Sequence, residues 1–227
     1  MIVAAAGIAA ALFFAQAAAP AAAPLAGGPA PDRFTACVAA IEANAEQAYE
    51  SAMAWANETR DIQAHRCAAM ALIEQGRVDQ GARRLEGLAA SAMDPSVAAA
   101  LWSQTGNAWL LAGEPSRARS AFTRLVTSIG EDRDALPDAY IDRALAYAGE
   151  RDWRKSEEDL SRALDIRPND ALALRMRARA RMHQSAFDLA LADAQAAVAA
   201  APGDVDARLV LGHVMESRRT GTPVEEQ

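Results

Sequence analysis

Hydrophobic residues recur at helical spacing from Phe34 to about residue 218. Between residues 137 and 170 they follow every three or four positions, stop at Gly149–Asp152, and then resume until Pro168. This pattern predicts a helix, a tight turn and a second helix, with the proline marking the end of the hairpin.

The pattern repeats after 34 residues without a gap. Pro168 and Pro202 are separated by this interval, and so are Asp170 and Asp204. A fixed period of this length is typical of stacked helical hairpins, because one hairpin cannot bury its apolar face alone. Proline cannot extend the preceding helix, and we expect each aspartate to cap the helix that follows.

These patterns predict an all-α repeat domain at residues 33–218, preceded by a signal segment and a flexible linker and followed by a disordered tail. Within the domain we expect a short cap, four repeats and a closing helix. The expected boundaries are 1–17 for the signal segment, 18–32 for the linker, 34–58 for the cap, about 62–95, 99–132, 137–170 and 171–204 for the repeats, 205–218 for the closing helix and 219–227 for the tail.

The residues at fixed positions in the hairpins resemble the tetratricopeptide repeat (TPR) family. In the 137–170 hairpin they are Tyr140, Ala144, Tyr147, Trp153, Ser156, Leu160, Ala163 and Pro168. In the 99–132 hairpin they are Trp102, Gly106, Trp109, Gly113, Ala118, Phe122 and Leu125, with Thr105 where the family has leucine. The resemblance implies a right-handed α-solenoid of stacked antiparallel helical hairpins.

The family binds proteins or peptides in a concave groove lined by the first helix of each hairpin. By this resemblance the groove positions are Gln63, Arg66, Met70, Ser103, Asn107, Leu110, Asp138, Ile141, Arg175, Arg179 and Met182. Asn107 matches the asparagine of the family's carboxylate clamp, whereas Ser103 stands where the clamp has lysine. A clamp of that kind for a chaperone tail is therefore not expected.

Arg175 and Arg179 give the groove its most specific expected chemistry. They are four residues apart, so they share one helical face, and each guanidinium can form two hydrogen bonds to a carboxylate. One hypothesis is that they bind an acidic segment or a free carboxylate of a partner. The alternative is that they pair with Asp138 or Asp142 of the same chain.

The charge of the chain argues against a nucleic-acid partner. It has 30 acidic and 23 basic residues, a net charge of -7 and a pI near 5.0. A protein that binds phosphate backbones is expected to present a basic face. We expect the acidic residues Glu157, Glu158, Asp159, Asp188 and Asp193 to lie on a solvated convex face.

The N-terminus indicates export. Residues 2–15 form a short apolar run, and Ala15-Gln16-Ala17 has the small-x-small form of a cleavage site, although no Lys or Arg precedes Arg33. We expect a periplasmic protein. The alternative is an uncleaved anchor in the inner membrane, the one case in which a membrane would be a partner.

The two cysteines and three histidines do not form a catalytic or metal-binding pattern. Cys37 and Cys67 fall on first helices of neighbouring hairpins, so in an oxidising compartment we expect a disulfide between them; two buried free thiols are the alternative. The histidines, His65, His183 and His213, lie in three different repeats without paired ligands. No cofactor or metal is therefore expected.

These observations favour a non-enzymatic interaction scaffold of the bacterial cell envelope. Two alternatives stay open: a membrane-tethered assembly factor, and a regulatory or substrate-presenting subunit of an envelope enzyme complex.

Overall fold

The computed structural model describes residues 32–225, so the expected signal segment and most of the expected linker lie outside the described residues. The part that is described consists of eleven α-helices and contains no β-strand. The helices are α1 (Arg33–Ala43), α2 (Ala45–Thr59), α3 (Ile62–Glu74), α4 (Val78–Ser91), α5 (Pro95–Leu111), α6 (Pro115–Ile129), α7 (Leu136–Gly149), α8 (Trp153–Ile166), α9 (Ala171–His183), α10 (Phe187–Ala200) and α11 (Val205–Thr220).

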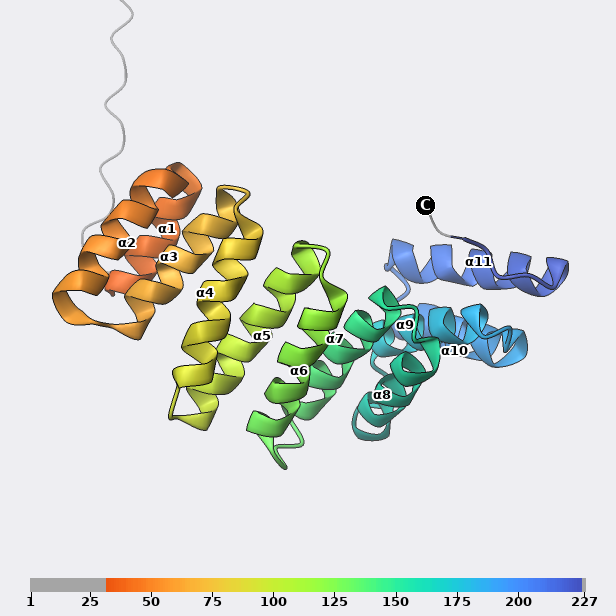
Figure 1. Ribbon diagram of the computed structural model, residues 1–227. Helices are drawn as coiled ribbons and strands as arrows, with labels where there is room; N and C mark the ends of the chain where they lie inside the picture. The colour runs from red at the N-terminus through yellow and green to blue at the C-terminus, as the bar shows by residue number, and fades with distance from the viewer. Residues whose placement is uncertain (1–31, 226–227) are drawn as a thin grey trace, which may run out of the picture. The chain divides into compact units, whose positions relative to one another are not determined.

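Consecutive helices pack against each other as hairpins, and each hairpin packs on the next (Figure 1). Odd-numbered helices also contact one another, α1 with α3, α5 with α7, α7 with α9, and α9 with α11. These first helices therefore line one side of the stack. The predicted all-α solenoid of stacked hairpins is confirmed.

Aspartates begin several of the helices, as the repeat pattern predicts. The side chain of Asp170 accepts a hydrogen bond of 3.0 Å from the backbone N–H of Ala173, and Asp204 accepts one of 2.9 Å from that of Asp206. Each carboxylate satisfies an N–H group that has no partner within the helix, and its charge is favourable at the helix N-terminus. The two predicted caps are confirmed.

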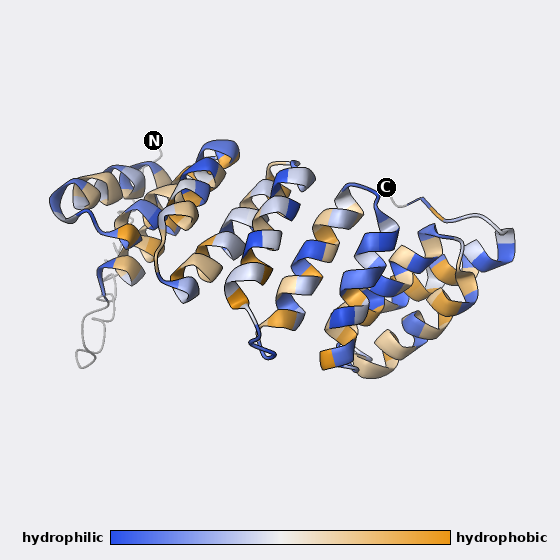
Figure 2. Ribbon diagram, turned by 60° about the horizontal axis from the view of Figure 1, so that its bottom comes forward, coloured by the Kyte–Doolittle hydropathy of each residue, from blue (hydrophilic) through white to orange (hydrophobic). Residues whose placement is uncertain are grey.

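One apolar cluster spans neighbouring hairpins. One cluster of buried residues runs from Ala69 on α3 to Ala146 on α7 and contains Trp102, Trp109 and Phe122. Hydrophobic and hydrophilic residues interleave along the helices, as Figure 2 shows, so each helix has a face to bury. The hairpins therefore depend on one another for much of their buried area.

The helices can approach closely because small residues stand at the contacts. A Cβ atom added at Gly106 of α5 would lie 2.3 Å from Cε1 of Phe122 on α6. The absence of a side chain at this position lets the aromatic ring lie directly against the backbone of α5.

Two of the acidic residues expected on a solvated face are buried instead. Asp159 is 1% exposed and accepts hydrogen bonds of 2.6 and 2.8 Å from the guanidinium of Arg143. Asp193 is 5% exposed and accepts bonds of 2.9 Å from both Nε and Nη2 of Arg177, and a third, 2.8 Å long, from Arg181. The expectation was wrong for these two residues because each carboxylate faces an arginine on the first helix of its own hairpin.

The C-terminal residues also differ from the sequence-based expectation. Helix α11 continues to Thr220, two residues beyond the expected end, and Gly221 then reverses the chain with φ of 75°. The backbone N–H of Val224 donates a hydrogen bond of 2.9 Å to Oγ of the buried Ser217. Residues 221–225 thus lie against α11, where a disordered tail was expected.

Candidate functional site

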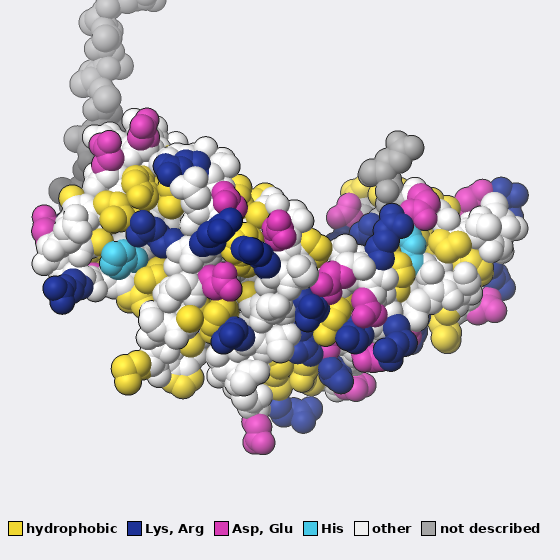
Figure 3. Space-filling view, viewed as in Figure 1, with side chains coloured by type: hydrophobic (Ala, Val, Ile, Leu, Met, Phe, Trp, Pro, Cys, Tyr) yellow, Lys and Arg dark blue, Asp and Glu magenta, His cyan; other side chains and the backbone are white. Residues whose placement is uncertain are grey.

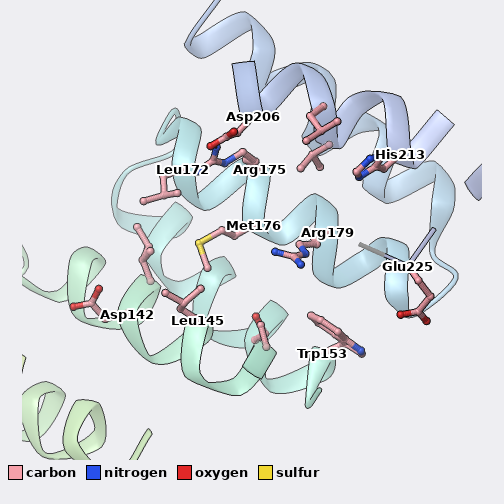
Figure 4. Close-up of a pocket in the computed structure, with 15 residues that line it drawn as sticks. Asp142, Leu145, Trp153, Leu172, Arg175, Met176, Arg179, Asp206, His213 and Glu225 are labelled. Carbon is pink, nitrogen blue, oxygen red and sulfur yellow. The ribbon is translucent and has the colours of Figure 1, made fainter. Parts of the chain in front are cut away.

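A cavity of about 710 Å³ lies in the C-terminal half, between the first helices α7, α9 and α11. Figure 4 shows this C-terminal cavity with its lining side chains as sticks. The lining residues are Ile141, Asp142, Leu145, Ala148, Trp153, Ser156, Leu172, Arg175, Met176, Arg179, Asp206, Leu209, Val210, His213 and Glu225. The cavity thus combines apolar side chains with both charge signs, as a site for a short peptide segment does.

Arg175 is held by carboxylates of the same chain. Its Nη1 atom lies 2.6 Å from Oδ2 of Asp206 and 3.5 Å from Oδ1 of Asp204. The partner is neither Asp138, which pairs with Arg167, nor Asp142. In the hypothesis drawn from the sequence, the carboxylate bound by Arg175 belonged to a partner protein. In the structure, Asp206 on the closing helix α11 provides it.

Arg179 projects from α9 toward the middle of the C-terminal cavity (Figure 4). Trp153, which also lines the cavity, stacks on the imidazole of His183 with 4.1 Å between ring centroids and 10° between ring planes. A guanidinium beside this stacked pair is well suited to a planar carboxylate, since it offers parallel N–H donors.

Asp142 contributes an unusual acid to the cavity wall. Burial, together with the negative charge of Asp138, raises the pKa of Asp142 to about 6. Desolvation disfavours the charged form of a carboxyl group, and a like charge adds to this effect. The charge of this wall consequently changes between mildly acidic and neutral pH.

The C-terminal residues reach the edge of the same site. Glu225 lines the C-terminal cavity and lies 3.8 Å from Nη2 of Arg151, which is in the turn between α7 and α8. Pro223 and Glu225 also line an adjoining hollow of about 320 Å³ together with Arg179 and other residues of α7–α9.

A second cavity, of about 420 Å³, lies in the N-terminal half between α1, α3 and α5. Its lining combines aliphatic side chains, the carboxylates of Glu42 and Glu74, and the amides of Gln104 and Asn107. The aliphatic residues are Val38, Ile41, Met70, Ile73, Leu85 and Leu111. This N-terminal cavity suits a bulky apolar side chain.

A disulfide joins α1 and α3, two of the helices that line the N-terminal cavity. Cys37 on α1 and Cys67 on α3 are bonded, with 6.4 Å between their Cα atoms. The cross-link closes a loop of 30 residues and holds the cap against the first full repeat.

The groove positions expected from the family resemblance fall into several environments. Ile141, Arg175 and Arg179 line the C-terminal cavity, Met70 and Asn107 line the N-terminal cavity, and Gln63 and Arg66 line a smaller hollow of about 260 Å³. The remaining positions line none of these three cavities: Ser103, Leu110, Asp138 and Met182.

Met182 belongs to the core. It is 0% exposed and packs with Ala178, Ala190, Val210 and Val214. Its expected place in the groove was wrong because it lies four residues after Ala178 and shares that residue's buried helical face.

Several cavity residues were not expected from the sequence, although the repeat period could have found them. The position of Ile141 and Arg175 recurs after 34 residues at Leu209, and the position of Arg179 recurs at His213. The closing helix therefore contributes the same positions as the full repeats do.

Charged side chains are mixed on the face drawn in Figure 3, where basic and acidic groups stand next to each other. Residues 32–225 contain no group of three or more His, Cys, Asp or Glu side chains that could hold a metal ion. Among these same residues, no helix combines the length and the hydropathy that a membrane span requires.

Stacked hairpins with cavities on the side of their first helices define a helical-repeat protein. A sequence profile described as tetratricopeptide repeat matches residues 68–136 and 141–205, more than half of the chain. The chain belongs to the tetratricopeptide repeat family. No curated protein matches it in sequence.

Solved structures agree with this assignment at the level of the fold. The Cut9–Hcn1 heterotetramer of the APC/C matches with a TM-score of 0.59 and 17% identity, covering 78% of this chain and 34% of that chain. The C-terminal TPR domain of a putative FK506-binding protein from Plasmodium falciparum matches with a TM-score of 0.52 and 16% identity, covering 59% of this chain and 97% of that domain. The myosin chaperone UNC-45 from C. elegans, solved with an Hsp90 peptide, matches with a TM-score of 0.50 and 25% identity. The match covers 53% of this chain and 14% of UNC-45.

Proposed function

We propose that this protein is a non-enzymatic adaptor that binds an extended segment of a partner protein along its first helices. The observation that carries the proposal is the C-terminal cavity, where Arg179 stands among apolar side chains and an aromatic stack. The similarity to UNC-45 supports this proposal, since the matched structure of that protein is a complex with an Hsp90 peptide.

The segment that suits the C-terminal cavity is acidic with an apolar neighbour. Arg179 receives the carboxylate, while Leu145, Met176 and Leu209 receive the apolar side chain. Arg175 orients α11 through Asp206 and keeps the third wall of the cavity in place. The N-terminal cavity takes a further apolar side chain of the same partner.

The proposed compartment is the periplasm of a bacterium. Two features support this location: the signal-like sequence at residues 1–17 and the disulfide between Cys37 and Cys67, a bond that is rare in reducing compartments. Cell fractionation and the intact mass of the protein recovered from cells test it, because an uncleaved N-terminus in the membrane fraction would contradict a free periplasmic form.

Site-specific photo-crosslinking tests the binding surface. Leu209 lines the C-terminal cavity, and Leu189 on α10 lies outside it, yet both are 55% exposed. A photoreactive residue at Leu209 should capture a partner in cells, and the same residue at Leu189 should not. Equal capture at both positions would contradict binding in the cavity.

The captured partner then tests the role of the arginine. Arg179→Gln should weaken its binding about tenfold or more, because a desolvated charged hydrogen bond is lost. Arg133→Gln removes the same charge from an exposed position outside the cavities and should leave binding unchanged. An unaltered affinity in Arg179→Gln would move the acidic contact elsewhere.

A further inference from the structure

The segment after α11 is packed, although it forms no helix or strand. Pro223 and Val224 are half-buried, and the N–H of Val224 is bonded to Ser217, whose side chain is fully buried. The reversal at Gly221 requires a positive φ of 75°, a conformation that glycine adopts without the strain other residues would incur. The sequence thus directs this segment back along α11.

The returning segment reaches the proposed binding site at Glu225. Glu225 and Arg179 both line the C-terminal cavity (Figure 4), and Oε2 of Glu225 lies 3.8 Å from Nη2 of Arg151. Pro223 and Glu225 also share the adjoining hollow with Arg179 and Trp153. An apolar residue followed by an acidic one is the chemistry proposed above for a partner segment.

We propose that residues 221–225 are a built-in cover at the rim of the C-terminal cavity, which they contact through Glu225, and that a partner segment must displace them. The proposal rests on the proposed function, since it assigns the tail and the partner to the same surface. The ion pair of Glu225 with Arg151 is exposed and therefore weak, while the attachment to α11 keeps the tail at a high local concentration. A partner segment must therefore bind the cavity more favourably than the tail does.

The bond from Val224 to Ser217 allows the tail to be released without changing a residue of the cavity. Ser217→Ala removes the acceptor and leaves a small side chain that fits the buried site. Loss of one intramolecular hydrogen bond should favour the released tail about fivefold. Ser120→Ala on the exposed face of α6 is the matched control, because its hydroxyl bonds only to a backbone carbonyl of the same helix.

Two measurements on the full chain test the proposal. Hydrogen exchange of the Val224 amide reports the docked tail, and it should be protected in the wild type and about fivefold faster in Ser217→Ala. Titration with the capped synthetic peptide acetyl-GLEG-amide, which has an apolar residue followed by an acidic one but lacks the tail's Pro-Val pair, reports competition, and its affinity should rise about fivefold in Ser217→Ala and not in Ser120→Ala.

The outcomes separate this proposal from the proposed function. An unprotected Val224 amide in the wild type, or measurable peptide binding with equal affinity for the wild type and Ser217→Ala, would overturn the built-in cover. If the peptide binds neither protein while the amide stays protected, the docked tail stands and the proposed preference for acidic segments is refuted.

Discussion

The buried pair of Arg143 and Asp159 provides the most demanding test of how the array is held together. The Asp159 side chain is 2% exposed and receives hydrogen bonds of 2.6 and 2.8 Å from Arg143, whose side chain is 12% exposed. Arg162 donates a further bond of 2.8 Å. Replacing Asp159 with alanine leaves the charge of Arg143 between α7 and α8 without this carboxylate.

The expected cost follows from that remaining charge. Removing one partner of a buried ion pair typically destabilises a protein by about 3–5 kcal/mol. The ring centroid of Tyr140 lies 5.8 Å from Cζ of Arg143, and this cation–π contact still stabilises the guanidinium after the carboxylate is removed. We therefore expect the cost of Asp159→Ala to fall near the lower end of this range. A loss of about 3 kcal/mol should lower the melting temperature by roughly 6–12 °C for a domain of this size.

Urea unfolding followed by circular dichroism measures the effect. Glu158→Ala is the control, since Glu158 pairs with Arg154 in the same helix and both side chains are largely exposed, at 46% and 71%. That change should alter the unfolding free energy by less than about 0.5 kcal/mol.

A double variant identifies the cause. Replacing both Arg143 and Asp159 with leucine removes the isolated charge and keeps apolar volume, so its stability should return to within about 1 kcal/mol of the wild type. If Asp159→Ala costs less than about 1 kcal/mol, or if the double variant is as unstable as the single one, the reasoning from a stranded charge is refuted.

Three further predictions concern packing, redox state and pH. Gly106→Ala should destabilise the fold by about 1–3 kcal/mol because the added methyl group meets Phe122. The control Gly87→Ala, at a helical position with open space around it, should stabilise the fold by about 0.5–1 kcal/mol, since alanine favours the helix more than glycine does. Equal changes in the unfolding free energy of the two variants would contradict the close contact at Gly106. Reducing the disulfide should cost about 3–4 kcal/mol in thermal unfolding, and an unchanged melting temperature would show that the cross-link is dispensable. Burial raises the pKa of Asp142 from 3.8 to about 6, so the folded protein favours the neutral carboxyl group; the stability associated with it is complete below pH 3.8 and is lost as pH rises through about 6. Asp142→Asn should therefore be more stable than the wild type by roughly 1–2 kcal/mol at pH 7, and its unfolding free energy should lack this pH dependence.

The order of the helices could be predicted from the sequence because local signals and the repeat period agree. Proline and aspartate at residues 168–170 and 202–204 mark helix boundaries through backbone chemistry, which acts over a few residues. The 34-residue interval then identifies equivalent positions without knowledge of the tertiary structure. Agreement between these two levels is characteristic of repeat proteins.

The side-chain partners could not be predicted in the same way. Asp159 and Glu158 are adjacent and equally polar, yet only Asp159 is buried, because a helix turns by about 100° per residue and only one of the two faces α7. The arginine opposite it, Arg143, lies 16 residues earlier, and no local pattern marks the two as partners.

The repeat period does mark this pair once both hairpins are compared. Arg143 and Asp159 become Arg177 and Asp193 after 34 residues, and the second pair forms the same two-bond contact. A buried ion pair that recurs at the period places the same first helix against the same second helix in both hairpins. It is therefore a candidate for setting the register of the hairpin as well as its stability.

Helix α11 shows why the end of the array and the binding site cannot be treated separately. It covers the apolar face of the last hairpin through Val210 and Val214, and it closes the C-terminal cavity through Leu209 and His213. Removing the helix would expose the core and open the cavity together, so loss of binding in such a truncation could not be assigned to the site. Substitution of Asp206, which is exposed and holds Arg175, acts on the cavity wall without uncovering the core and is the change that separates the two roles.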